Sequence, residues 1–194
     1  MDITDKFIKK VDNYLVQNLT KKRYKHTLST ALTAKKLCKA FNIEKKKGYA
    51  AGLLHDIARD FDVEDLFKTI AKDGNAISPE EQQEPDLLHG RAGAVLAKEL
   101  FNIDDEEILE AIQFHTTGIK GMGDLAKIVF IADYIEPCRK HITREYVKNL
   151  EGKQLNEMFE IVLRSVVDYL TIKGKKVSEK TLHLLEEFEN ERKK

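Results

Sequence analysis

The chain is poor in the residues that interrupt regular structure. Its 194 residues include three prolines, ten glycines and no tryptophan. Because proline and glycine are the strongest punctuators of local structure, their scarcity favours long helices over many short strands and turns. The length suffices for one domain with a sizeable core, and it does not require two.

The sequence also lacks the features that would indicate disulfides, membrane spans or a secretory signal. Cys38 and Cys138 are too far apart for a metal-ligand or redox spacing. No stretch approaches the roughly 20 apolar residues that span a bilayer. Met1 leads directly into charged residues, without the apolar segment of a signal peptide. These features predict a protein of the reducing cytoplasm, with no membrane partner.

Neither sign of charge is in excess, since 33 Lys and Arg balance 33 Asp and Glu. A protein that binds nucleic acid through its overall field is therefore not expected. Local basic clusters do occur, for example at residues 173–176, and the ordinary interpretation of such a run is a solvated helix end.

Apolar residues recur at helical spacing along most of the chain. Helices are predicted over residues 5–19, 20–41 and 44–58, after Asp62, from Leu87, from Asp104 to Gly118, over 125–136 and 151–172, and after Ser178. Ala51 and Gly52 would let a neighbouring helix approach closely. Residues 73–85 hold two of the three prolines and are predicted to form the clearest loop. The pattern favours one all-α domain.

Four of the six histidines lie at or near the end of a predicted helix with an apolar face. They are His26, His55, His89 and His115. His141 and His183 lie among charged residues and are predicted to be at the surface. Asp56 follows His55 directly, and an imidazole beside a carboxylate suits zinc, iron or manganese. Taken singly, such a pair is weak evidence, and a lone helix-end histidine is more often a hydrogen-bonded residue at the core edge.

Two aspartates, Asp56 and Asp133, interrupt otherwise apolar helices. A buried carboxylate is costly unless a cation or several donors compensate it. A structural salt bridge to Lys or Arg is the ordinary explanation for each. Together with the four histidines, however, a shared metal site accounts for six polar groups more simply than six separate compensations.

The order His26, His55-Asp56, His89, His115, Asp133 resembles the HD-domain metal-dependent phosphohydrolases, an all-α superfamily named for its His-Asp pair. Longer segments resemble the bacterial YqeK-type symmetrical bis(5'-nucleosyl)-tetraphosphatases, which split diadenosine tetraphosphate (Ap4A) into two ADP. These segments are Arg-Tyr-Lys-His at 23–26, Leu-Leu-His-Asp-Ile-Ala-Arg at 53–59, His-Thr-Thr-Gly at 115–118 and Ala-Asp-Tyr-Ile-Glu-Pro-Cys-Arg at 132–139. The resemblance covers roughly residues 20 to 185. Arg59 departs from it, since the family more often has Lys there, but the charge is kept.

The resemblance implies a single HD domain over residues 1–194, a helical bundle of about 8–10 helices. Its HD core would span about 20–140, and C-terminal helices in 151–192 would pack on that core.

The resemblance also implies a centre of two metal ions, divalent or trivalent and most often iron. The ligands would be His26, His55 and Asp133 for one ion, His89 and His115 for the other, and Asp56 bridging both. Two ions ~3.5–4 Å apart can share a bridging water or hydroxide as nucleophile and clamp the phosphate oxygens during in-line attack. The sequence contains no nucleophilic side-chain motif. The ligand types leave manganese, cobalt and zinc open.

Substrate contacts are expected from cationic and hydroxyl side chains near these ligands. Asp56, Asp133 and Arg139 are the predicted catalytic residues, and Arg139 would bind phosphate oxygens bidentately. The further predicted nucleotide contacts are His26, Arg59, Asp60, Thr116, Lys176 and Val177. The alternatives are structural: an ion pair for either arginine, capping for Thr116, and a helix end for Asp60.

Three functions stay open. The first is symmetrical hydrolysis of Ap4A, a small nucleotide, with ADP as product. The second keeps the metal centre but changes the substrate, giving an HD-type nucleotidase or a (p)ppGpp phosphohydrolase. The third is a non-catalytic nucleotide-binding regulator, which the complete set of six ligands disfavours. A homodimer is also left open.

Overall fold

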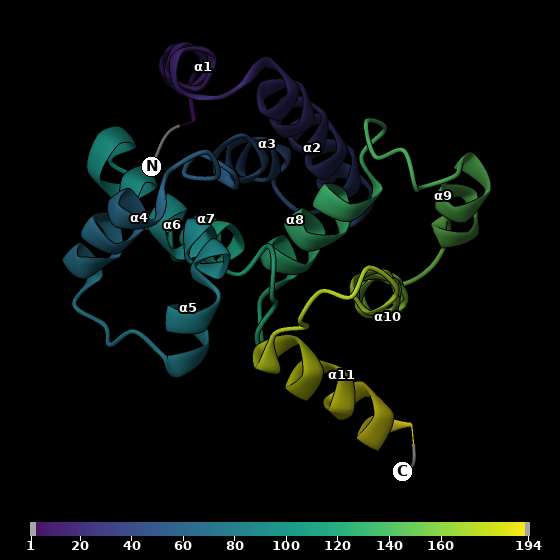
Figure 1. The fold of residues 1–194 in the computed structure, drawn as a ribbon. Coiled ribbons are helices and arrows are strands. Elements are labelled where there is room, and N and C mark those ends of the chain that lie inside the picture. The colour runs from purple at the N-terminus through teal and green to yellow at the C-terminus, as the bar shows by residue number, and fades with distance from the viewer. Residues whose placement is uncertain (1–2, 193–194) are drawn as a thin grey trace.

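The structure is a computed structural model that describes residues 3–192 (Figure 1). Within this range the chain forms eleven α-helices, two 3-10 segments and no strand. The α-helices are α1 (Asp5–Asn18), α2 (Lys21–Ala40), α3 (Lys45–Leu54), α4 (Val63–Ile70), α5 (Pro79–Gln83), α6 (Leu88–Phe101), α7 (Glu106–Gln113), α8 (Asp124–Ile135), α9 (Arg144–Leu150), α10 (Leu155–Ile172) and α11 (Glu179–Glu191). The predicted all-α class is confirmed, whereas the predicted number of about 8–10 helices is too low.

Helix α8 lies in the middle of the fold (Figure 1). It packs against α2, α3, α7 and α10, while α6 packs against α4 and α7, and α11 against α10. Buried apolar residues from α1 to α11 form one cluster. In it, Phe130 of α8 meets Phe159 of α10 edge to face, with ring centroids 5.2 Å apart. The C-terminal helices therefore contribute to the same core as α8.

The close contact between α2 and α3 depends on Gly52. A Cβ atom on this residue would lie 2.6 Å from the Cα of Ala31, far inside van der Waals distance. The predicted close approach of a neighbouring helix at this position is thus confirmed. Its consequence is that His26 on α2 comes beside His55, which directly follows α3.

Two helices end earlier than their apolar period predicts. Helix α3 ends at Leu54 rather than Ala58, and α7 ends at Gln113 rather than Gly118. After α3 the chain continues in tight turns, in which the amides of Ile57, Arg59 and Phe61 each donate to the carbonyl three residues earlier. Residues 51–58 are all buried, so the apolar pattern continues past the helix end and does not mark it.

The segment 73–85 is more ordered than a plain loop. Its residues Pro79–Gln83 form α5. Ser78 and Glu81 make a reciprocal capping box at the start of this helix, because each side chain accepts from the other residue's amide. The prediction of an uninterrupted loop was therefore wrong, since the Ser-Pro and Glu signals form a helix start.

Three smaller predictions also fail. Asp105, not Asp104, caps α7. The apolar spacing over residues 20–41 also predicts an inward-facing Leu32, whereas the structure leaves it 53% exposed. The predicted helix over 151–172 begins only at Leu155, and the separate α9 before it was missed. Gly152, with φ +79°, separates α9 from α10. Among the described residues, none of the helices is both long and apolar enough to cross a membrane.

Candidate metal centre

The four helix-end histidines converge from four parts of the chain. His26 lies on α2, His55 follows α3, His89 lies in the first turn of α6, and His115 follows α7. All four are at most 7% exposed. Asp56, beside His55, is also buried, and Asp133 projects from α8 with 21% of its side chain exposed.

The first half of the cluster contains His26, His55 and Asp133. The Nε2 atom of His26 lies 2.8 Å from Asp133 Oδ1 and 3.3 Å from the Nε2 atom of His55. Asp56 Oδ2 lies 3.5 Å from His26 Nε2 and 3.4 Å from His55 Nε2. The ligand atoms of His26, His55 and Asp56 are close enough together to hold a metal ion.

The second half contains His89 and His115, whose Nε2 atoms are 3.1 Å apart. The other carboxylate oxygen of Asp56, Oδ1, lies 3.5 Å from His89 Nε2 and 3.6 Å from His115 Nε2. This group could hold a second ion. Each oxygen of Asp56 therefore faces one half of the cluster, and Asp133 lies beside the first half.

Every histidine of the cluster has an acceptor at its other ring nitrogen. Nδ1 of His55, His89 and His115 lies 2.5–2.7 Å from a backbone carbonyl three residues earlier, those of Gly52, Asp86 and Ile112. Nδ1 of His26 lies 2.9 Å from Glu136 Oε1. Each Nδ1 can thus donate its proton outward, which leaves an unprotonated Nε2 pointing into the cluster.

This donor set fits metal ions. Four Nε2 lone pairs and two carboxylates point at one another, and in the neutral tautomers none of these imidazole nitrogens has a proton to share. Such an arrangement is repulsive until a cation lies between the groups. The outward hydrogen bonds at Nδ1 are the usual means by which proteins orient metal-binding histidines.

Burial and the protein's own charges shift the pKa values of the cluster residues in different directions. Burial disfavours the charged form of His55, but the carboxylates of Asp56 and Asp133 outweigh it and raise the pKa of His55 to about 10. Burial and the neighbouring His115 instead lower the pKa of His89 to about 3. Burial works against both carboxylates, yet the imidazoles hold the pKa of Asp56, and Arg139 with the imidazoles that of Asp133, well below the usual value. The site thus attracts positive charge.

Two arginines form the salt bridges expected of buried carboxylates. Arg23 Nη1 lies 2.6 Å from Asp56 Oδ2. Arg139 donates from Nη2 to Asp133 Oδ1 at 2.5 Å and from Nε to the Asp133 carbonyl at 2.9 Å. The structural alternative is therefore realised in part for both aspartates, but these two arginines do not compensate the four imidazole lone pairs, which face one another and the same two carboxylates.

Sequence reasoning gave no role to Arg23 or Glu136, although both contact the cluster. Arg23 precedes His26 by three residues, and Glu136 follows Asp133 by three. Residues three apart lie on the same face of a helix, so this spacing was the available signal. Glu136 leaves α8 at its C-terminal cap and is 1% exposed.

The other predicted substrate contacts divide into two groups. The hydroxyl of Thr116 lies 3.2 Å and 3.0 Å from the Nε2 atoms of His89 and His115, so it is at the cluster. Arg59 pairs instead with the exposed Asp86 at 3.4 Å. Asp60 is exposed, and its carboxylate accepts from the amide of Thr20 at the start of α2, so its contact is structural but is not the predicted helix end, because α3 ends at Leu54.

Two cavities adjoin the cluster, and Thr116 and Leu170 line both. The smaller, of about 160 Å³, also reaches His115, Asp133 and Arg139. The larger, of about 430 Å³, is lined by loop and helix residues that include Glu80, Glu84, Asp86, Lys175 and Lys176. Lys176 is thus near the cluster, with its Nζ 3.3 Å from Gln83 Oε1, whereas Val177, although half-buried, is not part of this wall.

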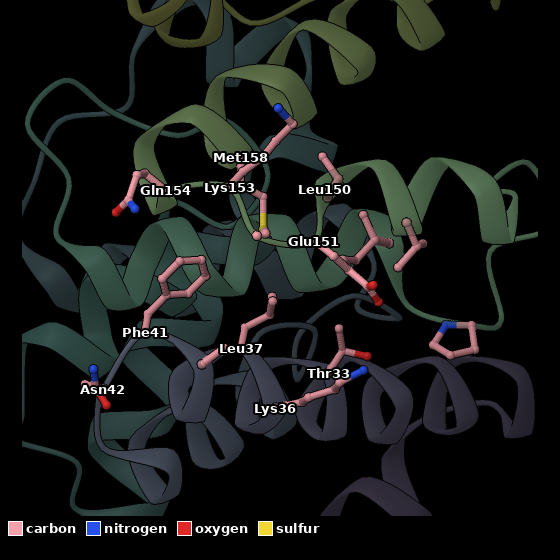
Figure 2. A pocket seen from close by; sticks show the side chains of 15 residues that line it. Thr33, Lys36, Leu37, Phe41, Asn42, Leu150, Glu151, Lys153, Gln154 and Met158 are labelled. Carbon is pink, nitrogen blue, oxygen red and sulfur yellow. The ribbon is translucent and has the colours of Figure 1, made fainter.

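A third cavity, of about 660 Å³, lies between α2, α8, α9 and α10. In Figure 2, Leu37 of α2 and Phe41, the residue after α2, lie across it from Met158 of α10. None of the six predicted metal ligands lines it. Size alone therefore does not identify the candidate site in this molecule.

Comparison with known proteins agrees with this geometry. The family model described as "HD domain" matches residues 23–138, which include the whole histidine and aspartate cluster. The chain therefore belongs to the HD domain family.

Individual proteins are also similar to this chain over most of its length. The Bacillus subtilis (strain 168) symmetrical bis(5'-nucleosyl)-tetraphosphatase is 33% identical over 83% of this chain and 86% of its own length. The enzyme of the same name from Halalkalibacterium halodurans is 33% identical over 85% of this chain and 88% of its own. A crystal structure from Clostridium acetobutylicum, described as that of a "predicted HD superfamily hydrolase involved in NAD metabolism", is 35% identical. It superposes with a TM-score of 0.85 and covers 92% of this chain and 95% of that one. The predicted resemblance is confirmed.

Proposed function

We propose that this protein hydrolyses Ap4A and related dinucleoside tetraphosphates symmetrically, with two molecules of ADP formed from Ap4A. The names of its relatives support the substrate and the symmetry of cleavage. The observation that carries a two-ion centre is the position of Asp56, whose two oxygens face separate pairs of histidines.

Six side chains would hold the ions: His26, His55, Asp56, His89, His115 and Asp133. Iron is the first candidate, with manganese, cobalt and zinc as alternatives. Bound there, two ions would lower the pKa of a water molecule and balance the charge that develops on the phosphate chain.

The remaining groups at the cluster would position the phosphates. Arg139 is 32% exposed at its side chain, so its guanidinium can reach a ligand while still paired with Asp133. A planar guanidinium can bind two phosphate oxygens at once. Thr116 can donate its hydroxyl proton to an oxygen beside His89 and His115. Arg23, on the Asp56 side, adds a second cation.

We further propose that residues 1–194 act as one domain, because α10 and α11 share the core of α8. The expected ligand is a small nucleotide in the cytoplasm, and a homodimer stays open.

Metal analysis combined with product analysis tests the proposal. The purified protein, loaded under reducing conditions, should contain about two metal ions per chain and convert Ap4A to ADP alone. The Asp56→Asn variant should lose the activity, which excludes a contaminating hydrolase. AMP and ATP as products would contradict symmetrical cleavage. Metal binding without turnover of Ap4A would contradict the proposed substrate.

A further inference from the structure

The smaller cavity beside the cluster has an aromatic wall that the metal centre does not use. It is formed by Tyr134, His141 and Tyr169. The rings of His141 and Tyr169 are stacked, with centroids 4.4 Å apart and an interplanar angle of 21°. Tyr134 meets His141 edge-on at 5.5 Å, and its hydroxyl donates to the carbonyl of Ser165 at 3.1 Å. The wall is thus held in place before any ligand binds.

His141 does not contribute to the hydrophobic core. It is exposed, as predicted from its charged surroundings, and yet it packs on a half-buried tyrosine. Partial burial of the ring, together with the positive charges of Arg139 and Lys173, lowers the pKa of His141, which favours the neutral ring at ordinary pH. A neutral, preformed pair of stacked rings is a suitable surface for a planar base, because every base offers a π-face.

The distribution of charged residues indicates different binding positions for the phosphates and for the nucleosides at the two ends of the substrate. Arg139 lines the smaller cavity on the side of Asp133 and His115. The larger cavity is lined by three carboxylates, those of Glu80, Glu84 and Asp86, beside its lysines. Phosphates therefore fit best at the cluster, where the cations gather, and uncharged nucleosides fit best in the two cavities.

We propose that the smaller cavity binds one nucleoside of the substrate, with its base stacked on the His141–Tyr169 pair, while the larger cavity binds the other nucleoside. The inference rests on the proposed function, since a substrate cut at its centre must extend to both sides of the metal cluster. The two cavities meet at Thr116, which also contacts His89 and His115. A volume of about 160 Å³ is below the ~300 Å³ at which pockets enclose a whole small ligand. It therefore suits one end of a longer substrate.

The test compares Ap4A with adenosine 5'-tetraphosphate, which has the same number of phosphates but one nucleoside. In Tyr169→Leu, which removes the ring and keeps apolar bulk, the KM for Ap4A should rise about fivefold or more, with kcat and metal content unchanged. The inhibition constant of adenosine 5'-tetraphosphate should change less than about twofold, because its nucleoside can occupy the larger cavity. Tyr169→Phe keeps the ring and should restore the KM.

His141→Ala provides a second variant, at an exposed position where folding is not at risk. It should raise the KM for Ap4A in the same selective way, whereas His183→Ala, the same change at another exposed histidine, should leave the KM unchanged. Equal changes for both ligands, or none for either, would overturn the stacking proposal while leaving Ap4A hydrolysis intact. Failure of the wild-type enzyme to cleave Ap4A would instead overturn the proposed function.

Discussion

Two buried polar clusters in this molecule are compensated in opposite ways. At the candidate metal centre, four imidazole nitrogens face one another with few protein donors to share among them. At Arg91, a buried guanidinium has a protein partner for every proton it can donate. The first cluster is only partly paired by its two arginines, and the second is fully paired. This difference in pairing, rather than burial, separates a candidate functional site from a structural one.

Arg91 of α6 and its partners in residues 73–81 form an anchor that fixes this segment to the helix. Asp73 accepts two hydrogen bonds from the guanidinium, at 2.5 Å and 2.7 Å. The carbonyls of Asn75 and Ala76 accept at 2.7 Å and 3.1 Å, and Glu81 Oε2 lies at 3.4 Å. A guanidinium has five N–H groups, and these are five contacts. The anchor also holds the path of the chain toward Asp86, whose carbonyl orients His89.

The largest effect is expected from a substitution that removes the negative charge of Asp56, which faces both halves of the cluster. Asp56→Asn keeps the size of the side chain but removes the carboxylate that faces both halves. Turnover of Ap4A should fall roughly 10³-fold or more, since the several kcal/mol supplied by bound ions would be lost. Steady-state rates and metal content would measure this. Asp65→Asn, an exposed change on α4, is the control, and near-normal activity in Asp56→Asn would contradict the assignment.

Substitution of Arg91 should lower the free energy of unfolding rather than change the candidate metal site. Arg91→Ala leaves Asp73 and Glu81 without their cation, so the free energy of unfolding should fall by about 3 kcal/mol. Arg91→Lys keeps the charge but not the five donors, and should lose about 1–2 kcal/mol. Urea unfolding measures both. Metal content per folded chain should stay near that of the wild type. A loss below about 0.5 kcal/mol in Arg91→Ala would mean that the anchor is not structural.

The helix-end position of the histidines, visible in the sequence, has a physical reason that only the structure reveals. The last four carbonyls of a helix have no amide partner within it. His55 is the first residue after α3 and His115 is the second after α7, and their Nδ1 atoms use such carbonyls, those of Gly52 and Ile112. A helix end therefore both presents the ring and fixes its tautomer. Position and residue type were predictable, and so was the grouping once the resemblance was recognised.

The anchor could not be predicted in this way. Its partners include two backbone carbonyls, and their positions depend on the path of a segment that contains an unforeseen short helix. The end of α3 was missed for a related reason. Residues 55–58 stay buried after the helix has ended, and Ile57 and Ala58 continue its apolar period, so the sequence carries no stop signal at Leu54.

The smallest expected effect is the response of the anchor to acid. The hydrogen bond from Arg91 holds the pKa of Asp73 below its usual value. A carboxylate with a depressed pKa stabilises the fold above its unfolded pKa, about 3.9 for Asp, and this stabilisation is lost as the pH falls through its folded pKa. The difference in unfolding free energy between wild type and Arg91→Ala should therefore be full at pH 6 and narrow below about pH 4. Urea midpoints measured across this range would test it. A difference that stays constant down to pH 2 would mean that packing of the arginine stem, not its pairing with Asp73, stabilises the segment.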